Sequence, residues 1–244
     1  MAQEHDRRVN ESKADGLAEL QLLHLTDSAL PIGSLAHSIG LETLVTEELL
    51  DAAKLPEFFE VYLQEAGLVE AVFCREAWRL GDVAPEAFSS VEWFKLNEKL
   101  SARKPSRESR AASTALGQHF MMAVNELGDF PVIAEAIHAS QRSRSMIHHS
   151  AAFGLTGGAL GFAPESVVAA FLHQSLAGLI SACQRLMPFG QREATRLLWG
   201  LKPAILRTAG RSALRTIDDV ASFTPLLDWG GMEHPALATR LFIS

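Results

Sequence analysis

The sequence predicts an all-α protein, folded as a single-domain helical bundle of roughly nine or ten helices. Apolar residues recur at three- and four-residue steps along most of the chain, and no long segment alternates with a period of two. With 244 residues, of which 48% are hydrophobic, the chain can bury a sizeable core. Neither a repeat nor an internal linker divides the helical region. We therefore expect one domain over residues 16–244, preceded by a polar, disordered tail over residues 1–15.

Proline and glycine positions indicate where the helices begin and end. Pro56 suits the first turn of a helix and Gly81 follows a basic last turn, so we expect one long helix between them. Pro85 opens the next helix, and Pro105 separates that helix from one that ends near Gly128. These positions predict the helix boundaries in the first half of the chain.

The second half continues the helical pattern. Residues 165–187 carry one apolar stripe at helical spacing, which predicts a helix that buries a single face. Pro203 interrupts residues 191–214, where we expect a kink or two shorter helices. Both cysteines lie on apolar helical stretches far apart in sequence, so Cys74 and Cys183 are expected to be buried free thiols.

A glycine cluster stands in the middle of the second half. It lacks the Gly-Lys-Ser/Thr ending of a phosphate-binding loop, so it supplies neither the lysine nor the hydroxyl that such a loop needs. Glycines at four-residue steps favour close approach of helix backbones instead, which is the role that we expect for Gly154, Gly157, Gly158 and Gly161.

Composition and charge limit the possible functions. The net charge of −7 and the isoelectric point of about 5.7 argue against a broad phosphate-binding surface, so we do not expect a nucleic-acid partner. The first ten residues are charged and lack the apolar core of a signal peptide. The least polar stretch, residues 151–164, is shorter than the roughly 20 residues of a membrane-spanning helix. We expect a cytoplasmic protein without a membrane segment.

Charge is distributed unevenly along the chain. Residues 40–70 are strongly acidic and contain Lys54 as their single basic residue, whereas residues 185–215 are strongly basic and contain Glu193 as their single acidic one. Within the basic segment, one helix face carries a row of arginines at four-residue steps, Arg207, Arg211 and Arg215. Such segments either form solvated surfaces, pair with each other inside the fold, or provide docking faces for charged partners.

The sequence offers no pattern for catalysis, for a metal or for a cofactor. It contains no Gly-x-Ser-x-Gly nucleophile elbow, no His-x3-His pair and no Cys-x2-Cys pair. His148 and His149 are adjacent, so on a helix their side chains point about 100° apart. We predict no catalytic residue, no bound cofactor and no dedicated tight nickel site.

The most informative segment is residues 22–42, where polar and turn-forming residues lie between two apolar runs. Pro31 fixes its own φ, and Gly33 can adopt a positive φ, so the chain turns here at a defined angle. We expect this corner to present its polar groups outward, which would make a charge change at Glu42 harmless to stability. The candidate binding residues are Asp27, Ser28, Pro31, Gly33, His37, Gly40 and Glu42. An ordinary helix-turn-helix corner remains the alternative.

This segment closely resembles the signature of the urease accessory protein UreF family, which reads Asp-Ser-Ala-x-Pro-x-Gly followed by His-Ser-x-Gly-x-Glu. Two further blocks resemble family motifs: the helix pattern with Glu108, Arg110, Ser113 and Gly117, and the ending Arg240-Leu241-Phe242-Ile243-Ser244. The chain departs from the family at Ser34-Leu35, where a glycine and an aromatic residue are usual. It also reads Met232-Glu233-His234-Pro235 where Met-x-His-Glu is common.

The resemblance implies a non-enzymatic adaptor and regulator, and a homodimer. It implies assembly with the accessory protein UreD/UreH and the GTPase UreG on apo-urease, in a complex that couples GTP hydrolysis to nickel insertion and lysine carbamylation. It adds to the candidate partner-binding residues Arg110, Ser113 and Gly117, and in a C-terminal docking tail Arg240, Leu241 and Phe242. Two alternatives stay open: a small-molecule enzyme that uses the Asp27, His37 and Glu42 corner, and a helical ligand-binding protein with an apolar cavity.

Overall fold

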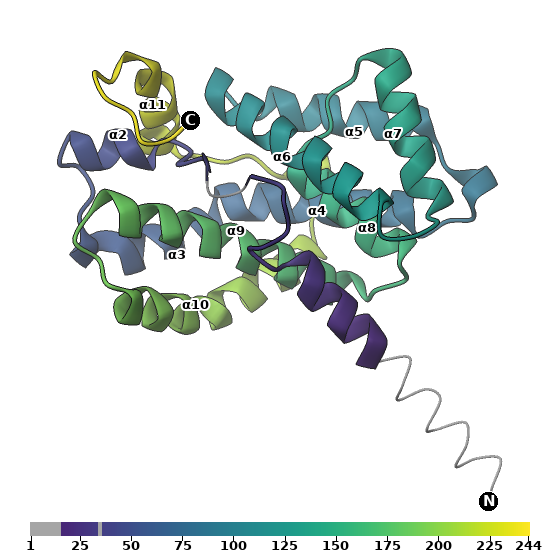
Figure 1. The fold of residues 1–244 in the computed structure, drawn as a ribbon, viewed down its shortest axis with the longest axis horizontal. Helices are drawn as coiled ribbons and strands as arrows, with labels where there is room; N and C mark the ends of the chain where they lie inside the picture. The colour runs from purple at the N-terminus through teal and green to yellow at the C-terminus, as the bar shows by residue number, and fades with distance from the viewer. Residues whose placement is uncertain (1–15, 34–35) are drawn as a thin grey trace, which may run out of the picture.

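The computed structural model describes residues 16–33 and 36–244, and over these ranges the chain is all-α without a β-strand (Figure 1). This confirms the predicted fold class, with eleven α-helices in the described ranges. Residues 16–25 are helical. They are followed by α2 (Leu41–Thr46), α3 (Leu55–Gln64), α4 (Ala66–Gly81), α5 (Ser90–Ala102), α6 (Arg107–Asn125), α7 (Pro131–Ser143), α8 (His149–Ala159), α9 (Pro164–Leu186), α10 (Gln191–Ser212) and α11 (Pro225–Glu233).

Short 3-10 helices join several of these elements. They are η2 (Ala52–Lys54), η3 (Pro85–Ala87), η4 (Ile217–Asp219) and η5 (His234–Ala236). Figure 1 shows the helical segment 16–25 projecting from the body, whereas the C-terminal end returns to lie beside α2 and α11. The tail over residues 1–15, for which we predicted disorder, lies outside the described residues.

The single long helix expected between Pro56 and Gly81 is wrong, because the chain breaks at Glu65. The backbone there has φ −103° and ψ −93°, which lies outside the helical region. The Glu65 carboxylate accepts a hydrogen bond from the backbone N–H of Phe223 at 2.9 Å. A contact 158 residues away therefore accompanies the break, and no proline or glycine at position 65 announces it in the sequence.

Of the two outcomes expected at Pro203, a kink or two shorter helices, the second is wrong, since α10 runs as one helix through this proline. A proline inside a helix lacks the N–H that would bond to the carbonyl four residues earlier, here that of Trp199. Pro203 is exposed and Trp199 is 70% exposed, so water can reach the orphaned carbonyl. The lost hydrogen bond is thus tolerated without ending the helix.

The packing of α4 against α8 depends on glycine, as predicted. A Cβ atom at Gly154 would overlap the carbonyl oxygen of Cys74, and one at Gly158 would overlap that of Trp78. Gly81 of α4 faces the backbone of α8 in the same way. The two helices therefore touch backbone to backbone. Gly161 has a different role, because its φ of +71° follows the end of α8 in the left-handed region.

The long helix α9 crosses the core. Its buried stripe includes Val168, Phe171, Leu172, Leu179 and Cys183, which matches the predicted apolar face. Both cysteines are free and buried, as expected. Among the described residues α9 is also the one helix that is long and apolar enough to cross a membrane, but 56% of its apolar window is buried inside the fold. The core helix of a folded domain has the same properties.

We expect the substitution Gly154→Ala to destabilise the protein by about 3 kcal/mol, because the new methyl group forces α4 and α8 apart. Urea unfolding measures this loss. The matched substitution Gly210→Ala, in the exposed part of α10 where a Cβ meets nothing within 4 Å, should stabilise the helix by up to about 1 kcal/mol. Equal unfolding midpoints for both variants would contradict the backbone contact.

Candidate functional site

The first half of the predicted corner is an exposed turn with an apolar anchor. The Asp27 carboxylate accepts a hydrogen bond from the N–H of Ala29 at 2.8 Å, a local turn that fixes its direction. Gly33 has a φ of +79°, as its position in the turn requires. Leu30 and Ile32 are buried while Pro31 is exposed. This part of the corner presents its surface outward, as predicted.

The second half of the corner is buried, so the expectation that the whole corner faces outward is wrong. Gly40 begins α2 with a φ of +89° and lies against α11, where a Cβ atom would be 2.7 Å from the carbonyl oxygen of Leu227. The Thr43 hydroxyl donates a hydrogen bond to the carbonyl of Gly230 at 2.8 Å. Glycines on both sides therefore let α2 and α11 approach closely.

Glu42 lies at the centre of this buried region, with 3% of its surface exposed. Its Oε1 accepts the backbone N–H of Leu241 at 2.6 Å, and its Oε2 accepts that of Phe242 at 3.2 Å. The Nε2 of His234 is 2.8 Å from the same Oε2. The carboxylate thus binds the C-terminal segment of its own chain rather than projecting toward a partner.

His234 is fully buried between two carboxylates. Its Nδ1 lies 2.6 Å from Oε2 of Glu108, and its Nε2 contacts Glu42. An ionised carboxylate only accepts hydrogen bonds, so a ring that carries hydrogens on both nitrogens satisfies both contacts. Glu108 also lies 3.5 Å from the guanidinium of Arg240. The sequence signal for His234 was its place in the family-like block 232–235, where the order of residues departs from the usual one.

The C-terminal residues lie against the protein's own fold, and their expected role in docking a partner stays a prediction. The N–H of Ile243 donates to the carbonyl of Ala36 at 2.9 Å, and the carbonyl of Ser244 accepts the N–H of Ile39 at 3.2 Å. The Nδ1 of His37 lies 2.8 Å from the Ser244 hydroxyl oxygen. Phe242 is buried beneath the Arg185 guanidinium, which lies 4.2 Å from the centre of its ring.

The exposed turn and the docked tail meet around one surface hollow of about 490 Å³. Large apolar side chains of the tail stand beside it, with Leu241 64% and Ile243 70% exposed. We call this surface the corner–tail patch. It is lined by Ser28, Ala29, Leu30, Pro31, Gly33, Ala36, Arg185, Leu241 and Ile243. The departure at Ser34-Leu35 lies outside the described residues.

The predicted residues of α6 serve the protein's own fold. Arg110 donates to the carbonyl of Pro105 at 2.9 Å, and the Ser113 hydroxyl lies 3.0 Å from Nδ1 of His148. Gly117 is buried, and a Cβ atom there would overlap the carbonyl of Ile147. The structure therefore places Arg110, Ser113 and Gly117 behind the corner rather than on the exposed patch.

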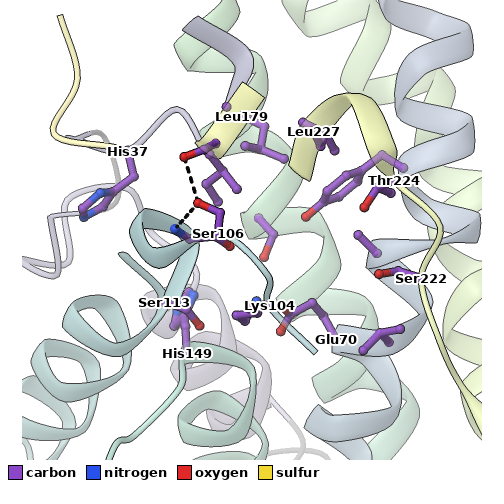
Figure 2. A pocket seen from close by; sticks show the side chains of 18 of the residues that line it. His37, Glu70, Lys104, Ser106, Ser113, His149, Leu179, Ser222, Thr224 and Leu227 are labelled. Carbon is purple, nitrogen blue, oxygen red and sulfur yellow. Dashed lines mark hydrogen bonds and ion pairs between the residues drawn. The ribbon is translucent and has the colours of Figure 1, made fainter. Parts of the chain in front are cut away.

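A cavity of about 140 Å³ with largely apolar walls and a few polar side chains lies behind the corner (Figure 2). Figure 2 shows Glu70 and Lys104 along one side of it, with His37, Ser113 and His149 at the other. Glu70 and Lys104 form a partly buried ion pair. Burial alone would raise the pKa of Glu70, but the adjacent Lys104 ammonium outweighs this effect, so the pKa is lowered.

Two buried polar atoms that border this cavity have no partner among the described residues, the Nε2 of His149 and the Oε1 of Gln174. Ordered water commonly satisfies such atoms in polar cavities of this size. Burial lowers the pKa of His149 to about 4, because its ring is packed against aromatic neighbours such as Phe171, 5.4 Å away between ring centres. The neutral form of this histidine is therefore the one that the fold stabilises.

The three residues considered for a small-molecule enzyme do not converge on one point in the structure. Asp27 bonds to the local turn, His37 contacts Ser244, and Glu42 is occupied by the tail and His234. Among residues 16–33 and 36–244, no group of three or more His, Cys, Asp or Glu side chains is arranged to hold a metal ion. The absence of a tight nickel site stays a prediction.

The chain was compared with known proteins. The UreF family model matches residues 49–202. A urease accessory protein UreF of Rhodopseudomonas palustris (strain HaA2) is 30% identical over 235 residues, which cover 96% of each chain. One of Rhizobium etli is 34% identical over 232 residues, which cover 93% of this chain and 98% of the relative. The chain belongs to the UreF family.

The UreF family model and the two motif regions cover different parts of the fold. Residues 49–202 contain α3 to α9 and the first half of α10. The corner and the tail lie outside this range, before and after it, yet they meet in space at Glu42. The relatives span more than nine tenths of the chain, so their similarity extends beyond the residues that the family model matches.

We expect Glu42→Gln to destabilise the protein by about 3 kcal/mol and to loosen the tail. The new amide NH₂ group is a donor that faces other donors, so at least one buried contact of the carboxylate is lost. Urea unfolding and hydrogen exchange at the Leu241 and Phe242 amides measure the two effects. Glu47→Gln, on the exposed side after α2, is the matched control and should change neither.

We expect His149→Phe to reduce the loss of stability in acid. With a pKa of about 4 in the folded state and about 6.5 in the unfolded state, His149 takes up a proton only on unfolding as the pH falls through this window. It therefore costs the native protein about 3 kcal/mol between pH 6.5 and 4, and a phenylalanine removes this cost. Urea unfolding at several pH values tests the prediction, which an unchanged pH slope would contradict.

Proposed function

We propose that this chain is a non-catalytic adaptor of urease maturation. In this role it links UreD/UreH and the GTPase UreG to apo-urease during nickel insertion, as a homodimer in the cytoplasm. Membership of the UreF family supports the role, because its relatives are named urease accessory proteins. The chain has no phosphate-binding loop, so GTP hydrolysis belongs to the GTPase partner.

The observation that carries the proposal is the corner–tail patch. It exposes Leu241 and Ile243 beside a hollow, and exposed apolar surface next to a hollow is typical of a protein-binding site. The tail is fixed by main-chain bonds to Glu42, so little conformational freedom is lost when a partner binds. A preorganised apolar patch suits an adaptor that must hold another protein.

The candidate residues divide into two groups under this proposal. Those that would touch a partner are Asp27, Ser28, Pro31, Gly33, Arg240 and Leu241. Those that would position them from behind are His37, Gly40, Glu42, Arg110, Ser113, Gly117 and Phe242. The first group is exposed at the surface, whereas the contacts of the second group are to the protein's own chain.

The enzyme alternative has less support. Its three candidate side chains are engaged in separate contacts, and a catalytic site needs groups that converge on one reacting atom. The ligand-binding alternative requires a roomy apolar cavity. The cavity behind the corner has largely apolar walls, but its volume of about 140 Å³ is below the roughly 300 Å³ of small-molecule sites, and a partly buried ion pair lies in its lining. Both observations favour the adaptor.

We expect the double substitution Leu241→Asp and Ile243→Asp to abolish binding to UreD/UreH and the activation of urease. Two carboxylates in place of exposed apolar side chains remove the apolar contact and add a desolvation cost at the interface. Co-purification with the co-expressed urease gene cluster and a urease assay measure the effect.

The control for this experiment is Phe223→Asp, because Phe223 is 79% exposed and lies outside the patch. The control should keep full binding, and circular dichroism should show that both variants fold. A double variant that still assembles the complex would overturn the assignment of the patch. If the native chain fails to assemble it, the adaptor role itself is wrong.

A further inference from the structure

The outer face of α10 carries large apolar side chains that the described residues leave uncovered. Trp199 is 70% exposed and Leu206 is 65% exposed. Their separation of seven residues places both on the same side of the helix. Leu214, in the turn that follows α10, is 83% exposed. Contiguous exposed apolar surface of this kind marks an interaction site more often than scattered single residues do.

Cations border this apolar stripe. Arg196, Arg207 and Arg211 lie along one edge of it by helical geometry, and Lys202 lies along the other, with its ammonium 3.6 Å from the centre of the Trp199 ring. Arg207 pairs with Glu60 of α3 at 3.2 Å, whereas Arg196 and Arg211 form no ion pair with the described residues. The face therefore holds positive charge that the described chain does not neutralise.

A groove of about 640 Å³ runs beside the stripe, between α10 and the start of α3. Its apolar walls include Pro56, Phe189, Leu197 and Leu201. Its charged lining residues are Glu60, Glu193 and Arg196, and Glu60 is already paired with Arg207. Gly200 also lines the groove, and a Cβ atom at this glycine would meet nothing within 4 Å. The groove is thus open space that side chains of another molecule can fill.

We propose that the groove and the α10 stripe together bind an amphipathic helix of a partner protein, whose apolar face is edged by Asp and Glu. This inference rests on the proposed adaptor role. A helix can insert apolar side chains at three- and four-residue steps into such a groove while its acidic edge meets the unpaired arginines. The surface is separate from the corner–tail patch, so the adaptor would hold two partners at once.

Charge argues against two other occupants of this surface, a second copy of this chain and an anionic membrane. A two-fold contact between copies of this chain would bring the arginines of two α10 helices into one interface, and α10 carries a single acidic residue, Glu193, to offset them. An anionic membrane would attract those arginines, but its charged surface would also meet Glu60 and Glu193, which line the groove. A helix that fills the groove can turn its apolar face toward these two glutamates and its acidic edge toward Arg196 and Arg211, so it avoids both conflicts.

The test uses the full chain reconstituted with UreD/UreH, UreG and apo-urease. A photo-crosslinking amino acid replaces Trp199, and the control position is Val91, which is 57% exposed on α5 far from α10 (Figure 1). We expect the Trp199 position to crosslink to one partner within a helical segment rich in Asp and Glu. The control position should give no crosslink to that segment.

Two variants measure how much the groove and the unpaired arginines contribute to the affinity for the partner. Gly200→Leu places a side chain in the groove, where a Cβ atom meets nothing within 4 Å, and improves helix propensity, so the fold should be retained. The pair Arg196→Glu and Arg211→Glu reverses the unpaired charge. Each should weaken binding of the crosslinked partner at least tenfold, whereas Lys95→Glu, an exposed charge reversal on α5, should leave it unchanged.

Several results would overturn the inference. Equal partner binding by the native chain and both variants would do so while leaving the adaptor role intact. Crosslinks to a second copy, or to a segment without acidic residues, would also contradict it. So would sedimentation with vesicles of phosphatidylcholine and phosphatidylglycerol that depends on Arg196 and Arg211, in the absence of a protein crosslink. If the native chain binds no partner, both the adaptor role and this inference fail.

Discussion

The buried carboxylate of Glu42 is the interaction on which the functional end of the molecule depends. A charge removed from water must be matched by donors, and here they come from two backbone amides of the tail and from His234. The contacts of Glu42 with these donors hold α2, η5 and the C-terminal residues together. The position of the exposed apolar side chains therefore follows from a carboxylate that is itself buried.

Much of the fold could be predicted because its causes are local. Pro105 lies between α5 and α6, and glycines permit the backbone contact of α4 with α8, since the backbone properties of these residues do not depend on distant residues. Pro85, expected to open the next helix, opens the 3-10 helix η3 instead, and α5 begins at Ser90. The break at Glu65 could not be predicted, because its carboxylate bonds to Phe223, 158 residues away. The continuity of α10 through Pro203 depends on solvent access, which is a property of the assembled fold.

The candidate site was predictable in its location and not in its orientation. Turn residues at 27–33 and apolar residues at 241–243 identify the two segments that meet. Whether a given polar side chain points outward or inward depends on what the rest of the chain brings to it. Glu42 and His234 lie 192 residues apart, so no spacing rule connects them, and Glu42 reads in the sequence as an ordinary first-turn glutamate.

The backbone contact between α4 and α8 has a consequence for how the bundle can move. Two helices that touch through side chains can slide past each other when those side chains change rotamer. At Gly154 and Gly158 the contact is between backbones, so no side-chain rotation can accommodate a slide. A one-turn slide of α8 toward its C-terminal end would bring Ser150 to the position of Gly154, which now accepts only glycine. The seam therefore locks the axial register of these two helices, and any rearrangement of the protein during its work must occur elsewhere.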